Sequence, residues 1–307
     1  MKHYSVLLKE CIEGLNINPD GIYVDATLGY AGHSEAILKR LRRGSLFAID
    51  QDEDAIHFGQ QRLSKVSDNF KIIYSNFEHL KECLEKKGIT SVDGILFDLG
   101  LSSPQIDEKE RGFTFMSDAP LDMRMDKNAT LKAEDVVNNY SLEDLIDIFY
   151  KYGEEKFSKS IAKNIIKERE KNRIVSTKSL VEIIKYSVPM QYFIKNHPER
   201  QIFQAIRIEV NSELKVLEKA LNDAISLLNP GGRICVISFH SLEDRIVKHI
   251  FKKMSEVNKL VKGLPVIPDE YKPLTKLINN KPILPSEEEI KENSRSKSAK
   301  LRIIERI

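Results

Sequence analysis

The first hundred residues alternate short apolar runs with amphipathic stretches. Four runs of strand length are rich in β-branched and aromatic residues: Ile22–Asp25, Ser45–Asp50, Lys71–Tyr74 and Asp93–Asp98. Helical periods separate these runs, at Ser34–Arg42, Glu53–Leu63 and Phe77–Lys87. Strands that alternate with helices build βαβ units with right-handed crossovers. The pattern therefore predicts an α/β fold whose parallel sheet is covered by helices on both faces.

The alternation stops near residue 107 and resumes near residue 208. The intervening stretch has an irregular beginning, 111–126, in which we expect turn and cap roles for Asp118, Asp122 and Asp126. Helical periods follow at Ser141–Tyr150, Phe157–Lys167 and Lys178–Val188. The first pattern then returns with a helix at Asn211–Leu228, a tight turn at Asn229–Gly232, strands at Ile234–Phe239 and Ala299–Arg306, and a helix from Ser241 to about Lys253. Because 307 residues exceed one ordinary domain, we expect a discontinuous sheet domain, 1–106 and 208–307, with an all-helical insertion, 107–207.

Charge is unevenly distributed behind a formal net charge of +2. Lys and Arg outnumber Asp and Glu in residues 156–207 and again in 251–307, whereas acids dominate residues 98–155. A basic block is the footprint of a surface that meets phosphates, but it is also typical of a solvated helix face. Taken by itself, the block favours the solvated face.

Composition excludes several classes of protein. No apolar run reaches the roughly 20 residues of a membrane span, and the start is charged where a signal peptide is apolar. Three cysteines at long spacings, Cys11, Cys83 and Cys235, disfavour a disulfide framework and a zinc site. We therefore expect a cytoplasmic protein with no membrane association.

Three of the predicted strands end in residues suited to ligand binding. In an open parallel sheet the ligand crevice lies beyond the carboxyl ends of the strands. The loop Asp25–Ser34 follows the first strand, and its Gly29 and Gly32 allow the backbone to approach a ligand. The second strand ends in Asp50, where a carboxylate can accept both hydroxyls of an adenosine ribose, and the fourth ends in Asp98.

A glycine loop with a strand-end acid is shared by dinucleotide dehydrogenases and S-adenosylmethionine methyltransferases. The loop Gly29-Tyr-Ala-Gly32 is not Gly-x-Gly-x-x-Gly, whose glycines bring the backbone against a pyrophosphate. A sulfonium cofactor has no phosphate and needs polar groups for its amino and carboxylate ends, which Asp25 and His33 can supply. Alone, Asp25 could be a turn cap and His33 could make a local hydrogen bond; with Asp50 and Asp98 the pattern favours a methyltransferase.

Motifs along nearly the whole chain resemble one family. They are 3–10, 25–34, 93–105, 111–115, 120–126, 152–155, 203–207, 237–245 and 298–302. In this order they are similar to the bacterial ribosomal RNA small-subunit methyltransferase H family, also called MraW. Two positions depart from the family pattern: Ala31 replaces the middle glycine of Gly-x-Gly-Gly-His, and Ala119 stands where Asp-Gly-Pro is usual. A methyl group at position 31 is compatible with the loop if that residue keeps a negative φ.

The resemblance implies a Rossmann-like class I methyltransferase sheet, S-adenosylmethionine as cofactor, and methylation of N4 of a cytidine in the decoding region of 16S rRNA. By position, the family's cofactor contacts fall on Ala31, Gly32, His33, Asp50, Phe77, Asp98 and Gln105. Phe77 offers an apolar face to the adenine, although a role in the core is equally compatible with its sequence position.

Methylation of an amino nitrogen needs alignment with the methyl donor and an acceptor for an N4–H hydrogen. Asp98, Ser102 and Ser103 are the candidates by position, although the chain lacks the Asp/Asn/Ser-Pro-Pro-Tyr/Phe motif of many amino methyltransferases. Methylation at C5 would need a cysteine nucleophile, and residues 98–105 contain none. Methyl transfer requires no metal, and the acids of 107–126 lack calcium-loop spacing.

Substrate contacts are predicted around this crevice and on the basic segments. One prediction is that His240 or Ser241 contacts the target nucleotide. The alternative is that Ser241 caps the following helix and that His240 only packs within the fold. The resemblance favours a phosphate-binding role for Lys163, Lys167 and Arg169 in the insertion and for Arg295 and Lys297 in the tail. The implied partner is 16S rRNA within the 30S subunit; monomer and homodimer stay open. A methyltransferase acting on DNA or protein and a nucleotide-binding module without catalysis are the alternatives.

Overall fold

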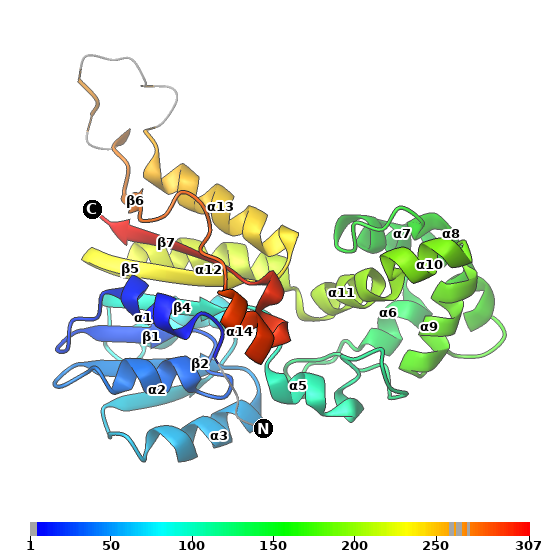
Figure 1. Ribbon diagram of the computed structural model, residues 1–307, viewed down its shortest axis with the longest axis horizontal. Helices are drawn as coiled ribbons and strands as arrows, with labels where there is room; N and C mark the ends of the chain where they lie inside the picture. Colours follow the sequence, from blue (N-terminus) through cyan, green and yellow to red (C-terminus); the bar gives the residue numbers. More distant parts are fainter. Residues whose placement is uncertain (1–4, 258–260, 262–265, 269–270) are drawn as a thin grey trace. The chain divides into compact units, whose positions relative to one another are not determined.

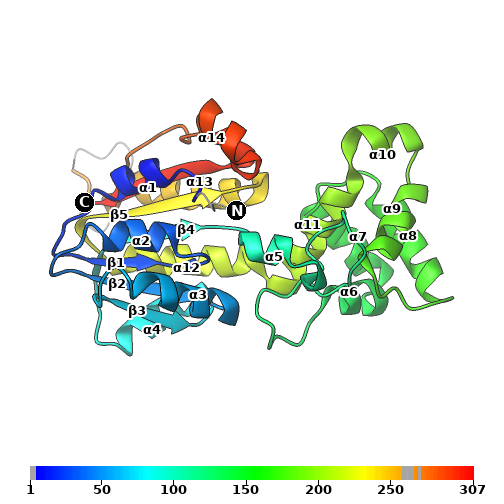
Figure 2. The same cartoon turned by 60° about the horizontal axis from the view of Figure 1, so that its bottom comes forward.

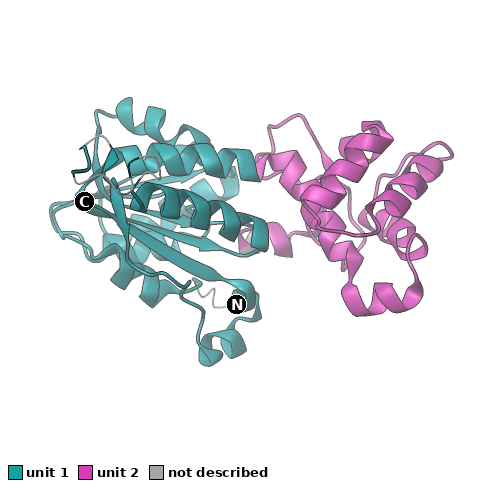
Figure 3. Cartoon of the chain, turned by 90° about the horizontal axis from the view of Figure 1, so that it is seen from above, with its two compact units in different colours: residues 1–100, 214–307 teal, residues 101–213 magenta. Residues whose placement is uncertain are grey.

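The computed structural model describes residues 5–257, 261, 266–268 and 271–307, and the side chains of Ser103 and Pro104 lie outside this description. The chain divides into two compact units (Figure 3): unit 1 comprises residues 1–100 and 214–307, and unit 2 comprises residues 101–213. The divisions fall six residues before position 107 and six residues after position 207, the limits expected from the sequence. Unit 1 therefore contains both segments with alternating strands and helices.

Within the described residues of unit 1, seven strands form one sheet in the order β3-β2-β1-β4-β5-β7-β6 (Figure 1). The strands are β1 (Ile22–Asp25), β2 (Ser45–Asp50), β3 (Phe70–Tyr74), β4 (Val92–Asp98), β5 (Leu228–Ser238), β6 (Thr275–Leu277) and β7 (Lys300–Arg306). Strands β1 to β5 pair in parallel, and β7 pairs antiparallel with both β5 and β6. This confirms the α/β, Rossmann-like sheet predicted from the sequence.

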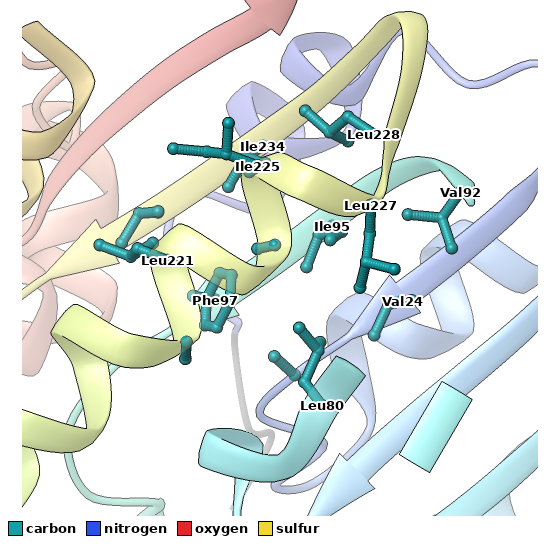
Figure 4. Packing of buried hydrophobic residues seen from close by; sticks show 14 of the residues in the cluster. Val24, Leu80, Val92, Ile95, Phe97, Leu221, Ile225, Leu227, Leu228 and Ile234 are labelled. Carbon is teal, nitrogen blue, oxygen red and sulfur yellow. The ribbon is translucent and has the colours of Figure 1, made fainter. Parts of the chain in front are cut away.

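Side chains of the central strands alternate between two apolar clusters. In β2, Phe47 and Ile49 belong to one cluster, whereas Leu46 and Ala48 belong to the other. Successive strand residues point to opposite faces, so a strand that is apolar at every position is buried on both sides. The first cluster surrounds Phe97 (Figure 4). Both faces of the sheet are therefore closed by helices.

The helices of unit 1 divide between these faces. The first cluster contains residues of α4 (Leu80–Glu85), α12 (Glu213–Leu227) and α13 (Ser241–Ser255). The second contains residues of α1 (Leu8–Leu15), α2 (Gly32–Leu38) and α3 (Glu53–Leu63). The other elements in the described part of unit 1 are the 3-10 helix η1 (Phe77–His79), α14 (Glu287–Glu292) and the 3-10 helix η4 (Ser294–Ser298).

Some local predictions were wrong. The segment Asn229–Gly232 is not a separate tight turn, because β5 runs through it with a register shift against Val92 and Gly94. Gly231 absorbs the irregularity with a φ of 80°. The sequence patterns also did not predict the short elements α1, α14 and β6.

Unit 2, in its described part, is built from helices (Figure 2). They are α5 (Ser103–Asp107), the 3-10 helix η2 (Lys109–Arg111), α6 (Ala133–Asn139), α7 (Leu142–Lys151), α8 (Ser158–Arg169), α9 (Thr177–Tyr186), α10 (Met190–Asn196) and α11 (Pro198–Asn211). Ser141 and Ser176 begin α7 and α9 as N-caps, which satisfy backbone N–H groups left free at a helix start. Asp122 and Asp126 accept backbone hydrogen bonds from Arg124 and Asn128, which confirms their turn roles.

No helix among the described residues is both long enough and apolar enough to cross a bilayer.

Candidate functional site

Three neighbouring parallel strands end in an aspartate. Asp25 is the last residue of β1, Asp50 of β2 and Asp98 of β4, and the order β2-β1-β4 sets these strands side by side. The carboxyl ends of parallel strands lie at one edge of a sheet. The structure thus brings both strand-end acids predicted as cofactor contacts, Asp50 and Asp98, to the edge that carries the glycine loop.

The carboxylate of Asp50 is bonded to the glycine loop. The backbone N–H of Gly29 donates to Oδ2 over 2.8 Å, and that of Asp52 donates to Oδ1 over 3.0 Å. Gly29 has a φ of 47°, which glycine adopts without steric cost. Burial raises the pKa of Asp50 to about 6, and the backbone donors limit the rise. The N–H of Gln51 is a third backbone donor. Because the two oxygens offer about four acceptor sites, the carboxylate can still accept a ribose hydroxyl.

Ala31 has a left-handed backbone conformation, which is unfavourable for a residue with a Cβ. It is the N-cap residue of α2, with a φ of 58°, so the condition of a negative φ is not met. The left-handed conformation costs an alanine about 1 kcal/mol. At the next position a Cβ would meet Ser5 Oγ, so a side chain in place of Gly32 would force the Ser5 side chain to move. Ala119, the other departure from the family pattern, is not among the described residues with positive φ.

Asp25 is buried beneath this loop. Ser34 Oγ donates to its Oδ2 over 2.7 Å, and the N–H of Thr27 donates to its Oδ1 over 3.2 Å. Burial raises the pKa of Asp25 to about 7, against the effect of the Ser34 hydrogen bond. Asp25 therefore holds the loop to the sheet, which agrees with the turn-cap interpretation.

Asp98 has the most perturbed carboxyl group of the three. Its pKa is raised to about 8, first by burial and then by the negative charges of Asp25 and Glu243. Its Oδ2 lies 3.5 Å from His33 Nδ1, and its Oδ1 is buried without a hydrogen-bond partner among the described residues. A buried acceptor without a partner is costly unless a ligand satisfies it.

The imidazole of His33 has a fixed orientation. Its Nε2 lies 3.0 Å from the carbonyl oxygen of Val6, and a carbonyl only accepts, so Nε2 carries a hydrogen. Nδ1 therefore faces Asp98, and one proton can be shared between the two groups. His33 thus combines a local hydrogen bond with a position beside the unsatisfied carboxyl group.

Phe77 begins η1, next to the ends of β2 and β3. Its ring packs edge-to-face on Phe97, with centroids 5.8 Å apart, and is only partly buried. Asn76 caps η1 and donates through Nδ2 to Gln51 Oε1 over 2.7 Å. One part of the Phe77 ring therefore belongs to the core, and the accessible remainder leaves room for the predicted adenine contact.

The cap of α13 lies one residue earlier than the sequence spacing predicts. His240, not Ser241, is the N-cap, and it forms a capping box with Glu243. Its Nε2 lies 3.1 Å from Glu243 Oε1, and Glu243 Oε2 accepts the N–H of Phe239 over 2.8 Å. Ser241 is the exposed first residue of the helix. The alternative in which Ser241 caps and His240 only packs is therefore wrong; contact with a nucleotide stays a prediction.

Three predicted residues belong to unit 2. Gln105 is buried, and its Oε1 accepts the N–H of Ser102 over 3.1 Å. Ser102 precedes α5, and Ser103, whose side chain is outside the description, begins it. Their roles toward cofactor and substrate stay predictions.

The predicted phosphate contacts differ in their surroundings. Lys163 and Lys167 are exposed on α8, but Arg169 Nη1 donates to the carbonyl oxygens of Val137 and Tyr140. Arg169 therefore holds the end of α6, and its guanidinium is already engaged. Arg295 and Lys297 are exposed in η4.

Sequence reasoning missed several supporting groups. Thr27 Oγ1 accepts the N–H of Asp98 over 2.7 Å and so connects the loop after β1 with the end of β4. Glu243 contributes negative charge to the same edge. Polar residues two positions after a strand, or one turn into the following helix, are the only sequence signal for such groups.

The edge of β1, β2 and β4 suits a cationic ligand with a ribose. The charge of Asp50 raises the pKa of Asp25, and the charge of Asp25 raises the pKa of Asp98. One oxygen of Asp98 has no hydrogen-bond partner among the described residues. S-adenosylmethionine carries a sulfonium and an ammonium group, and the nucleoside end needs an acceptor such as Asp50. The chemistry of these groups therefore fits that cofactor.

Solved structures similar to this chain include three methyltransferases. A candidate rRNA methylase from Clostridium thermocellum has 12% identity and a TM-score of 0.46, with 99% of this chain and 100% of that chain covered. An rRNA methylase from Streptococcus thermophilus has 13% identity and a TM-score of 0.42, with 98% and 93% covered. A candidate methyltransferase from Streptococcus mutans, in complex with S-adenosylhomocysteine, has 11% identity and a TM-score of 0.44, with 99% and 100% covered. These likenesses are too remote to inform on substrate or mechanism.

The sheet order and its acidic edge define a class I S-adenosylmethionine-dependent methyltransferase. The sequence model of the MraW methylase family matches residues 1–307, the whole chain. The chain therefore belongs to the MraW methylase family, and its cofactor is S-adenosylmethionine.

Proposed function

We propose that the chain methylates the exocyclic N4 of a cytidine in the decoding region of 16S rRNA in the small ribosomal subunit. Membership of the MraW methylase family supports methyl transfer, and the sequence resemblance supplies the nucleotide. The observation that carries the chemistry is the Asp98 carboxyl group, with one buried oxygen that lacks a partner among the described residues. An exocyclic amino group is the kind of donor that such an oxygen needs.

The nucleophile in this reaction is weak, because the N4 lone pair is delocalised into the cytosine ring. S-adenosylmethionine supplies an electrophilic methyl group. Asp98, as the carboxylate, accepts a hydrogen bond from N4 and so stabilises the positive charge that develops there. N4 forms the new N–C bond with its lone pair, the S–C bond pair stays with the sulfur, and the surplus N4 proton passes to Asp98.

His33 positions this carboxyl group. Its Nε2–H is committed to the carbonyl oxygen of Val6, so Nδ1 stays directed at Asp98 Oδ2, 3.5 Å away. The imidazole can therefore hold the transferred proton after the reaction. Substrate alignment supplies the remaining acceleration.

Apart from Asp98 and Gln105, the cofactor residues divide into three groups in this proposal. Asp50 accepts a ribose hydroxyl, and Phe77 lies against the adenine. The loop residues Ala31, Gly32 and His33 offer backbone groups to the methionine end. Gln105 is retained as a further contact from unit 2 on the strength of the resemblance.

An exposed row of lysines supports an RNA-binding role for unit 2. The α8 lysine stripe consists of Lys159, Lys163 and Lys167, which are spaced four residues apart and are all exposed. Positions i, i+4 and i+8 lie along one side of a helix, about 6 Å apart along its axis. None of the three forms an ion pair within the described residues, so their charges are available to phosphates. We add Arg295 and Lys297 as contacts from η4, and leave Arg169 out because its guanidinium is engaged.

Transfer of label tests the function. The protein is incubated with methyl-labelled S-adenosylmethionine and, separately, 30S subunits lacking the modification, free 16S rRNA, DNA and ribosomal protein. We expect label on RNA, recovered as N4-methylcytidine after digestion to nucleosides. Asp98→Asn, which keeps the size of the side chain, should reduce transfer by about 100-fold or more. Label only on DNA or protein, or on another atom of the base, would reject the proposal.

A further inference from the structure

Unit 1 contains a pocket of about 290 Å³ beside the second half of α13 and strand β6. Its lining includes Lys248, Lys252, Glu256 and Asn280, together with the apolar residues Phe251 and Leu277. None of these residues belongs to the acidic edge at β1, β2 and β4. The volume is near the lower end of the range for small-ligand sites. Most of the lining residues are polar or charged, which suits a charged ligand.

The lining of this pocket is positive on balance, with Lys248, Lys252 and Arg302 against Glu256. The exposed face of α13 carries Lys248, Lys252 and Lys253. Lys248 forms no ion pair within the part of the chain that the structure describes. Lys252 Nζ lies 3.7 Å from Glu256 Oε1, and both side chains are more than half exposed, so this pair contributes little stability and can open. Two ammonium groups one helical turn apart can therefore meet a single anion.

On the other wall of the pocket, hydrogen bonds hold the side chain of Asn279, whereas the side chain of Asn280 forms none with described residues. Asn279 donates through Nδ2 to the carbonyl oxygen of Leu301, and its Oδ1 accepts the N–H of Ile303 over 2.7 Å. Asn280 is exposed, and its amide makes no hydrogen bond with described residues. Its donor and acceptor are therefore available to the edge of a planar ligand.

Arg302 also lines the pocket, but its guanidinium is held by Asp244, with Nε to Oδ1 at 2.7 Å. It shapes the wall and leaves the two lysines as the anion contacts. Cations, an apolar surface and a free amide together match a nucleotide, which has a phosphate, a flat base and a polar base edge. A simple anion would use the lysines alone.

We propose that this pocket binds one unpaired nucleotide of the RNA substrate, at a distance from the methylated base. Lys248 and Lys252 contact its phosphate, Leu277 lies against the base, and Asn280 meets the base edge. The inference rests on the proposed RNA substrate. With this site, unit 1 also contacts the RNA substrate through a residue set of its own.

Binding of full-length 16S rRNA to the full chain at several salt concentrations tests this site. Each phosphate contact with a single strand lowers the slope of log affinity against log salt by about 0.7, and contributes about fivefold at 0.1 M salt. The double variant Lys248→Ala/Lys252→Ala removes the contact with one phosphate, so it should lose about fivefold in affinity at 0.1 M salt and about 0.7 in slope. Binding of S-adenosylmethionine should not change.

The matched control is Lys86→Ala/Lys87→Ala, which removes the same charge from exposed positions outside the pocket. It should change RNA affinity by less than about twofold. Equal losses in the two double variants would overturn the site, because net charge alone would then explain the effect. Competition by cytidine monophosphate at the pocket with no effect of the lysines on RNA binding would identify a free-nucleotide site instead. If the parent protein binds no RNA, the proposed function itself fails.

Discussion

The pKa of Asp98 predicts that cofactor binding releases a proton. Burial and the charges of Asp25 and Glu243 raise this pKa to about 8, so the group is mainly protonated in the free protein at pH 7. His33 is the other titratable group against it, 3.5 Å away. A sulfonium and an ammonium group favour the ionised carboxylate. Cofactor affinity should therefore rise with pH and level off above about pH 8.

The magnitude follows from the ionised fraction of Asp98. With a pKa of about 8, half of the molecules are ionised at pH 8 and about one in a hundred at pH 6. If only the ionised form binds tightly, affinity falls by about fiftyfold between pH 8 and pH 6. At pH 7, binding should release about 0.9 of a proton from this group.

Isothermal titration calorimetry measures both quantities. Titrations in two buffers with different ionisation enthalpies give the number of protons released, and a pH series gives the affinity. The control is Asp98→Asn, because it leaves Asp25 and the cofactor's own ammonium group able to titrate. The ratio of the two dissociation constants should change by about fiftyfold between pH 8 and pH 6. An unchanged ratio, with equal proton release from both proteins, would refute the role of Asp98.

Three further predictions concern other parts of the molecule. Asp50→Ala should weaken cofactor binding by about 1–3 kcal/mol through lost charge-assisted hydrogen bonds, and calorimetric affinity equal to that of the parent would reject the ribose contact. Ala31→Gly relieves the left-handed alanine and should leave the free energy of unfolding unchanged or raise it by up to about 1 kcal/mol, whereas Ala36→Gly inside α2 should lower it by about 1 kcal/mol. Denaturant unfolding that shows equal losses would contradict the strain assigned to Ala31. Replacing the α8 lysine stripe by alanine should lower the salt slope of RNA binding by about 2, and a parental slope would remove α8 from the RNA surface.

The sequence predicts the strands of unit 1 well, because strands buried on both faces are apolar throughout. The predicted bounds Ile22–Asp25 and Ser45–Asp50 agree with β1 and β2 in the structure. Strand β6 has only three residues, Thr275–Leu277, which is too short for a period to appear. Asp50 and Asp98 were predicted at strand ends because the apolar runs that form β2 and β4 end at these residues.

Other properties of the site depend on the assembled fold. The positive φ of Ala31 follows from the path of the loop into α2, and no local pattern of residues signals it. The raised pKa of Asp98 needs Asp25 and Glu243, which are distant in sequence. Arg169 looks like a surface cation in a basic block, yet its partners are carbonyl oxygens at the end of another helix. Sequence spacing carries no information about these partners.

A crystal structure of the protein with S-adenosylhomocysteine tests the central claim most directly. We predict the ribose hydroxyls within hydrogen-bonding distance of Asp50, the sulfur beside the ends of β1 and β4, and the oxygen of Asp98 that lacks a partner among the described residues left open for the substrate amino group. A ligand seated away from the ends of β1, β2 and β4, or one whose ribose faces another residue, would contradict the account.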